Sequence, residues 1–397
     1  MTQAPIIDVL TYEGRATMKA ATFGESVDMV TGHALAMMRG YKDGGTASMA
    51  KHFPGYGSVA TDAHKGTAEI TKSFEELDSC DIAPLKTLFK NGLNGVMTGH
   101  VITHCIDGEH PATLSKKMIT SYLRKTLGFD GIVETDAMRM SAIQDRYGTA
   151  QASVEAVQAG CDLVLLRGNR EHFDEGYNAI LGAVKNGSIS EERLNESVRR
   201  ILREKQSAGI LDNPYADPEE AERIVGCEEH RELLRQFSER SITILKGKEL
   251  PLKRAERIFT VCAEPQKIRA AEDSIQCPDM LIKAMGTDGM LVKLNPDAED
   301  IKRAVDAVRN YNTVVIGMCN GIIYNKQAEL VKALYDTGKK IVAVAMDSPY
   351  DVEIVPYVEN FVCTYGVSAQ ASEAAARVIY GELSCNAVPP VTIRNMG

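Results

Sequence analysis

Short apolar runs that alternate with helical segments limit the fold of this chain more than any other feature. Five such runs occur in its first half, at residues 5–9, 48–52, 95–100, 131–135 and 162–166. This rhythm is typical of βα units around a parallel sheet, because neighbouring parallel strands need a long crossover that a helix usually provides. We therefore predict an α/β fold whose first domain is a TIM-type β/α barrel, with five of its strands in these runs.

Helix signals lie between and after the runs. Residues 115–127 have a helical pattern with Ser115 in the N-cap position, and residues 190–205 have another with Ser190 in that position. The second segment places four apolar residues on one face: Leu194, Val198, Ile201 and Leu202. We expect it to be the closing helix of the first domain.

A second set of apolar runs follows a polar stretch. Residues 209–240 are polar and helical, and the pairs at 213–214 and 217–218 are Asn-Pro and Asp-Pro helix breakers. The later runs are residues 242–245, 258–262, 313–317, 340–346 and 361–365. The prediction is a barrel domain over 1–208, a helical linker over 209–240, and a smaller open α/β sandwich over 241–397.

Charge and composition exclude several classes of partner. The net charge of −9, without a basic block interleaved with aromatics, argues against nucleic acid. No apolar run approaches the roughly 20 residues of a membrane helix, and the first residues lack the features of a signal peptide. The nine scattered cysteines contain no CxxC pair, which suits a reducing compartment. We expect a cytoplasmic protein, although loss of an N-terminal segment would also remove a signal peptide.

Titratable residues follow three of the predicted strands. In an α/β barrel, the catalytic groups lie where strands end and loops begin. The residues found there, after the second, third and fourth runs, are Lys51, His52, Asp62, His64, His100 and Asp136. All of them except His100 are the candidate site residues.

Taken singly, these residues also have structural explanations. An aspartate at a strand end, such as Asp136, often caps the next helix, and a lone histidine such as His100 is often packed and hydrogen-bonded. His52 and His64 lie twelve residues apart, which is not the close spacing of metal ligands. We predict no metal ion and no other cofactor. Spacing alone leaves structural and catalytic roles open for Asp136 and His100.

The order and wording of the motifs carry more information than single residues. They read KHFPG at 51–55, DAH at 62–64, VMTGH at 96–100, PATLS at 111–115 and GFDGIVETD at 128–136. Together they resemble glycoside hydrolase family 3, and more narrowly its β-N-acetylhexosaminidase branch. The resemblance continues into the second domain through SITILK at 241–246, SPYD at 348–351 and PVTI at 390–393.

This resemblance implies a retaining glycoside hydrolase that removes terminal, non-reducing β-linked N-acetylglucosamine from cell-wall or chitin-type fragments. Asp136 would be the nucleophile that forms a covalent glycosyl intermediate. His64 would transfer the proton and Asp62 would orient it, since a histidine titrates near the working pH and a hydrogen-bonded carboxylate fixes its tautomer. Lys51 and His52 match the contacts of the family to the hydroxyls of a small saccharide substrate.

The chain also departs from the family pattern. The family barrel has eight strands, so about three N-terminal strands and their Asp-x-Glu-Gly-Gly segment have no counterpart. An arginine that the family carries falls on Ala21, for which Arg15 or Lys19 could substitute, and the family Gly-His-Gly reads GYG at 55–57. A barrel shortened in this way has open sheet edges, so we expect a homo-oligomer.

Two other functions stay open from the sequence. One is a β-N-acetylglucosaminide phosphorylase, because a histidine repels incoming phosphate less than a carboxylate would. The other is a non-catalytic, truncated remnant that binds a sugar or a partner protein.

Overall fold

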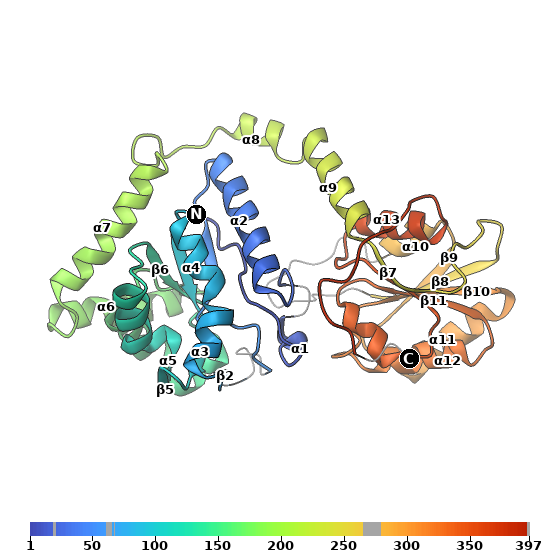
Figure 1. Ribbon diagram of the computed structural model, residues 1–397, viewed down its shortest axis with the longest axis horizontal. Coiled ribbons are helices and arrows are strands. Elements are labelled where there is room, and N and C mark those ends of the chain that lie inside the picture. The colour runs from blue at the N-terminus through green and yellow to red at the C-terminus, as the bar shows by residue number, and fades with distance from the viewer. Residues whose placement is uncertain (19–20, 61–65, 67, 265–278, 395–397) are drawn as a thin grey trace. The chain divides into compact units, whose positions relative to one another are not determined.

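Residues 1–18, 21–60, 66, 68–264 and 279–394 are described by the structure, a computed structural model (Figure 1). The chain divides into two compact units, Met1–Ala216 and Asp217–Gly397. Each unit combines helices with parallel strands, so the predicted α/β class is confirmed. No helix among the described residues is both long and apolar enough to cross a lipid bilayer.

The first unit is built around three parallel strands in the order β1-β3-β6. Their bounds are Met49–Phe53 for β1, Gly95–Thr98 for β3 and Ile132–Thr135 for β6. Single parallel bridges extend both edges, from Ile6 to Lys51 and from Leu163 to Glu134. All five predicted runs therefore lie side by side in chain order. Within the described part of the chain they form an open sheet, so a closed barrel is not observed.

Helices and one small sheet surround these strands (Figure 1). The helices are α1 Arg15–Met18, α2 Val27–Asp43, α3 Phe74–Glu76, η1 Leu77–Asp81, α4 Ala83–Lys90, η2 Ala112–Leu114, η3 Lys117–Thr126, α5 Ser141–Ala159, α6 Arg170–Lys185 and α7 Glu191–Ser207. The small sheet has the order β2-β4-β5, with bounds Ala68–Ile70, Val101–Thr103 and Asp107–Pro111. The two predicted caps are confirmed, because the Ser115 hydroxyl accepts from the Met118 N–H and the Ser190 hydroxyl accepts from the Arg193 N–H.

One face of α7 differs from the sequence pattern. Of its four apolar residues, only Ile201 packs against the cluster of Met49, Met97 and Ile132 beneath the sheet. The other three are exposed, and so are three apolar residues of α6: Leu194, Val198, Leu202, Phe173, Tyr177 and Leu181. The physical reason is that the sheet ends at Leu163, so no further βα unit of the described chain covers these helices. The expected homo-oligomer stays a prediction.

A buried carboxylate fastens α7 to the sheet instead. The Asp162 side chain is fully buried and lies 2.5 Å from the Arg124 Nη2 atom and 3.3 Å from the Arg200 Nη1 atom. It also accepts hydrogen bonds from the Ser197 hydroxyl at 2.6 Å and from the Val133 N–H at 3.0 Å. A buried charge is tolerated when it is paired and hydrogen-bonded in this way.

The second unit contains a six-stranded sheet in the order β7-β12-β11-β10-β8-β9. Its strands are β7 Thr243–Gly247, β8 Ile258–Ala263, β9 Asp288–Val292, β10 Thr313–Met318, β11 Lys340–Ala345 and β12 Asn360–Cys363. Only the β7–β12 pairing is antiparallel. Its helices are α8 Pro218–Ile224, α9 Glu228–Ser241, α10 Met280–Met285, α11 Ala298–Ala307, η4 Val308–Asn310, α12 Lys326–Tyr335, η5 Pro349–Ile354 and α13 Ala369–Ile379.

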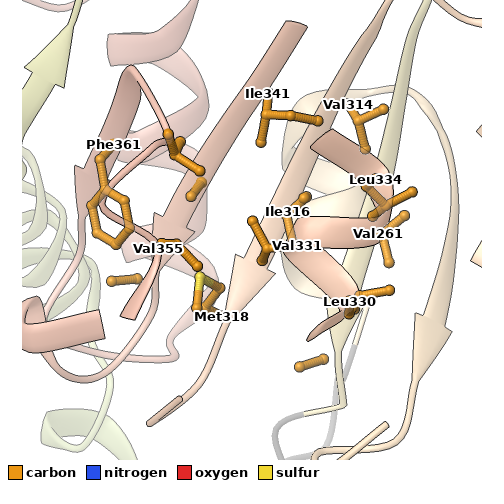
Figure 2. Packing of buried hydrophobic residues seen from close by; sticks show 14 of the residues in the cluster. Val261, Val314, Ile316, Met318, Leu330, Val331, Leu334, Ile341, Val355 and Phe361 are labelled. Atoms are coloured by element: carbon orange, nitrogen blue, oxygen red, sulfur yellow. The ribbon is translucent and has the colours of Figure 1, made fainter. Parts of the chain in front are cut away.

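Apolar clusters cover both faces of this sheet. On one face, Leu330, Val331 and Leu334 of α12 pack over strand residues such as Val261 and Ile316 (Figure 2). On the other face, α10 and α13 pack over residues that include Cys262 and Val315. This is the open sandwich that the alternating runs predict. The sequence pattern missed β9, because this edge strand is half-exposed and begins with Asp288-Gly289.

Asp351 is a fully buried carboxyl group in η5 of the second unit. Within the described chain neither of its oxygens accepts a hydrogen bond of ordinary geometry. The N–H groups of residues 320–322 are nevertheless close enough to stabilise the charged carboxylate and so to lower its pKa. Burial is the main cause that raises its pKa from 3.8 to about 7, and the charge of Asp347 adds to this. Since the unfolded group ionises near pH 4, the folded protein loses stability as the pH rises from about 4 to about 7.

We expect Asp351→Asn to remove this pH dependence. The amide carries no charge, so the variant should gain about 2–4 kcal/mol over the natural protein at pH 8 and nothing at pH 4. Denaturant unfolding of the whole chain at both pH values measures this difference in the free energy of unfolding. Glu373→Gln removes a charge from an exposed position of α13 and is the matched control. An equal gain from Asp351→Asn at pH 4 and pH 8 would contradict the expectation.

Candidate active site

The candidate residues come together because β1, β3 and β6 are parallel, although the pairing of β1 with β3 shifts by one residue between Lys51 and Phe53. Phe53 pairs with Thr98, and Thr98 pairs with Thr135, so the carboxyl ends of the three strands meet at one edge. Residues at this edge include His52 at the end of β1 and Asp136 directly after β6. The structure therefore brings His52 and Asp136 together at this edge, and their role as site residues stays a prediction.

Asp136 is a partly exposed carboxylate, with 22% of its side chain open to solvent. Its Oδ1 atom accepts a hydrogen bond of 2.7 Å from the Ala137 N–H, and its own N–H donates to the Thr98 carbonyl oxygen. Although burial favours the protonated form, the charges of His52 and His100, the Ala137 N–H and Lys51 together hold the pKa of Asp136 below its ordinary value. The side chain is thus an ionised carboxylate at neutral pH.

His52 lies between two carboxylates. Its Nδ1 atom is 2.8 Å from an oxygen of Asp8, and its Nε2 atom is 3.8 Å from the Oδ2 atom of Asp136. Burial works against protonation of the ring, but the charges of Asp8 and Asp136 raise the pKa of His52 above its ordinary value. Because a carboxylate only accepts hydrogen bonds, Asp8 fixes a proton on Nδ1.

Sequence reasoning missed Asp8. It lies inside the first apolar run and is almost fully buried, where it also accepts hydrogen bonds from the backbone N–H groups of His52 and Tyr56. The available signal was a charged residue in the run that spans residues 5–9, since a charge in a buried strand requires a partner.

His100 has a structural environment. The ring is buried, with Nδ1 2.8 Å from the Thr113 hydroxyl and Nε2 3.0 Å from the Ala137 carbonyl oxygen. Since a carbonyl only accepts, Nε2 carries a proton that fixes the loop after Asp136. The packed and hydrogen-bonded role that we considered for His100 is confirmed, and the ring also lowers the pKa of Asp136.

Other predicted residues have different outcomes. Lys51 lies on β1 near enough to Asp136 to lower the pKa of that carboxylate. Asp62 and His64 lie outside the described residues, so their role as the proton-transfer pair stays a prediction. Arg15 donates to the Tyr12 carbonyl oxygen at 2.6 Å and stacks over the Tyr12 ring. Lys19, the other predicted substitute for the arginine of the family, also lies outside the described residues.

A second buried carboxylate supports the loop that follows β1. Gly55 has φ +144°, and a Cβ atom built there would lie 2.7 Å from the Cβ atom of Asp81. The Lys72 ammonium lies 2.6 Å from an oxygen of Asp81 and stabilises its charge in this buried position. Only glycine leaves room for this contact. Neither Lys72 nor Asp81 has a sequence signal, since both act through contacts distant along the chain.

Among the described residues, one group could accept a metal ion on distance alone. The ligand atoms of Asp107, Glu109 and His110 lie within 4.8 Å of one another. Glu109 and His110 are exposed, and Asp107 already accepts a 2.6 Å hydrogen bond from the Ser115 hydroxyl. All three residues lie on β5, and we assign them no role in the site.

We expect Asp8→Asn to lower the pKa of His52, because the variant loses the largest charge that favours the protonated ring. The pH titration of the imidazole resonances by NMR measures this change. Glu69→Gln is the control, since Glu69 pairs with the exposed His104 at 3.0 Å and should leave His52 unchanged. An unaltered His52 titration in Asp8→Asn would show that Asp8 does not control the ring.

Several known proteins have sequences similar to this chain. The family model described as "Glycosyl hydrolase family 3 N terminal domain" matches residues 1–204. A protein named beta-hexosaminidase A from Pseudoalteromonas piscicida is 26% identical, over 99% of this chain and 73% of that protein. A beta-hexosaminidase from Hydrogenovibrio crunogenus is 35% identical, over 48% of this chain and 52% of its own length.

A solved structure has the same fold over nearly the whole chain. It is a glycoside hydrolase family 3 beta-N-acetylglucosaminidase from Paenibacillus sp. strain FPU-7, with 29% sequence identity and a TM-score of 0.91. The match covers 99% of this chain and 76% of that protein.

Proposed function

Because the chain belongs to glycosyl hydrolase family 3 and to its β-N-acetylhexosaminidase branch, we propose that it removes terminal, non-reducing β-linked N-acetylglucosamine from cell-wall or chitin-type fragments. The observation that carries the proposal is Asp136, an ionised carboxylate held at the carboxyl ends of three parallel strands. One of its oxygens accepts from the Ala137 N–H, and the other lies 3.8 Å from His52. Catalytic groups of α/β barrels lie at this end of the strands, which supports the proposed role of Asp136 as the nucleophile.

The proposed reaction has two steps. In the first, an oxygen of Asp136 forms a bond to the anomeric carbon while the glycosidic C–O bond breaks, and His64 gives its proton to the leaving oxygen. In the second, His64 takes a proton from water, whose oxygen attacks the anomeric carbon and releases the Asp136 carboxylate. The configuration is retained, because each step inverts the anomeric carbon once.

The remaining residues have supporting roles in this proposal. Asp62 orients the His64 ring and stabilises its charged form. Lys51 and His52 bind sugar hydroxyls and keep Asp136 ionised, and Asp8 holds His52 with Nε2 directed to the site. The phosphorylase alternative uses the same groups and replaces water by phosphate in the second step. The non-catalytic alternative predicts no turnover by folded protein.

We expect Asp136→Asn to reduce turnover of an aryl N-acetyl-β-glucosaminide by at least about 10³-fold, because the neutral amide is a poor nucleophile and cannot form the ester. A slow 5-fluoro sugar substrate should label Asp136 in the natural protein, as detected by mass spectrometry of its peptides. Circular dichroism of the variant is the control for folding. Label on another residue would contradict the role of Asp136.

We expect His64→Ala to affect substrates according to their leaving group. An activated aryl group needs no proton to leave, so its cleavage should change little in the first step, whereas a disaccharide should lose about 10²-fold or more in kcat/KM. Asp62→Asn should show the same pattern more weakly, since the ring is still present. Equal losses on the two substrates would remove His64 from the acid role.

A further inference from the structure

Two arginines lie at the same edge of the first sheet as Asp136. Arg139 follows Asp136 by three residues, and Arg167 follows the segment whose Leu163 pairs with β6. A hydrogen bond of 3.1 Å from the Met138 N–H to the Leu165 carbonyl oxygen joins the two segments. Both arginine side chains are exposed. The loops that carry them are therefore neighbours beside the proposed nucleophile.

The Arg139 side chain extends across the loop that carries Arg167 and Gly168. A Cβ atom built on Gly168 would lie 2.8 Å from its Nη1 atom and 2.9 Å from its Cδ atom. Gly168 has φ +136°, so glycine is also favoured there by the backbone. The guanidinium group of Arg139 thus lies directly against the residue that follows Arg167.

Neither arginine has an anionic partner in the described chain. The structure gives no hydrogen bond or ion pair to Arg139 or Arg167 among the residues it describes, whereas Arg170 on the next turn pairs with Asp174 at 2.8 Å. The first turn of the 16-residue helix α6, which begins at Arg170, adds positive potential at the same place.

We propose that Arg139 and Arg167 bind an oxyanion next to the sugar held at Asp136. A guanidinium group binds carboxylate or phosphate through two parallel N–H donors, which makes arginine the matching side chain for either anion. The anion is a carboxylate on the aglycone of the substrate or inorganic phosphate. This inference rests on the proposed function, since it places the anion relative to the sugar that Asp136 attacks.

Each anion has a defined chemical consequence. A carboxylate on the aglycone would select acidic disaccharides and leave the two hydrolytic steps unchanged. Phosphate would instead attack the anomeric carbon of the glycosyl ester, forming a C–O–P linkage while the bond to Asp136 breaks. The product is then N-acetylglucosamine 1-phosphate, and the second step does not consume water.

The first experiment compares a carboxylated substrate with its neutral analogue. The substrates are N-acetylglucosaminyl-β-1,4-N-acetylmuramic acid and the same disaccharide with its carboxylate converted to a methylamide. Arg139→Gln and Arg167→Gln should each lower kcat/KM for the acid about tenfold or more and leave the methylamide unchanged. Arg199→Gln removes an equal charge from an exposed position of α7 and should change neither.

The second experiment tests phosphate as the anion. Turnover of a neutral aryl N-acetyl-β-glucosaminide is measured with and without inorganic phosphate, and the products are identified by ³¹P NMR. If phosphate is the anion, it should accelerate turnover and yield the sugar 1-phosphate, and Arg139→Gln should abolish both effects. The proposal would be overturned if Arg139→Gln and Arg167→Gln turned over the aryl glycoside equally and also left two other properties unchanged. These properties are the kcat/KM for the carboxylated disaccharide and the effect of phosphate on turnover.

A binding measurement separates this proposal from the proposed function. If folded protein does not turn over the neutral aryl glycoside, the proposed hydrolase function fails, and turnover gives no information on the arginines. Calorimetric titration with N-acetylmuramic acid and with inorganic phosphate then tests the anion site directly. Binding of one anion that weakens about tenfold in Arg139→Gln and not in Arg199→Gln supports the site. The absence of any such difference overturns it.

Discussion

The carboxylate of Asp8 is the constraint on which the geometry of the site depends. A buried charge needs hydrogen-bond donors, and Asp8 finds them in the His52 ring, the His52 N–H and the Tyr56 N–H. These contacts join the first extended segment to β1 and to the loop after it. They also determine which ring nitrogen of His52 faces Asp136. The ionisation of Asp136 in turn depends on His52, so a residue outside the predicted site controls its electrostatics.

Much of the fold follows from local patterns in the sequence. The apolar runs locate β1, β3 and β6, and the caps Ser115 and Ser190 are confirmed by their hydrogen bonds. Local sequence patterns do not predict which residues from different parts of the chain will contact one another. The buried carboxylates of Asp8 and Asp81 therefore escaped prediction, since their partners lie 44 and 9 residues away.

The helices α6 and α7 show a different limit of sequence reasoning. Their apolar periodicity indicates a face that requires cover, but periodicity does not identify what provides that cover. Ile201 reaches the cluster under the sheet, while Leu194 and Val198 remain exposed. Motif order singled out Lys51, His52 and Asp136, and the structure places Lys51 and His52 on β1 and Asp136 directly after β6. The pair of Asp62 and His64 falls outside the described residues and depends on the motif alone.

The contact between Gly55 and Asp81 has a consequence for how sequence variation in this protein is interpreted. Asp81 fills the space that a side chain at position 55 would need, and Tyr56 next to it donates to Asp8. An alanine at position 55 would push on this loop and strain the Tyr56 contact that holds Asp8 and His52 in place. A genetic screen for lost activity would therefore recover changes at positions 55 and 81. These positions would resemble substrate contacts in such a map, although their effect is mechanical and passes through the backbone.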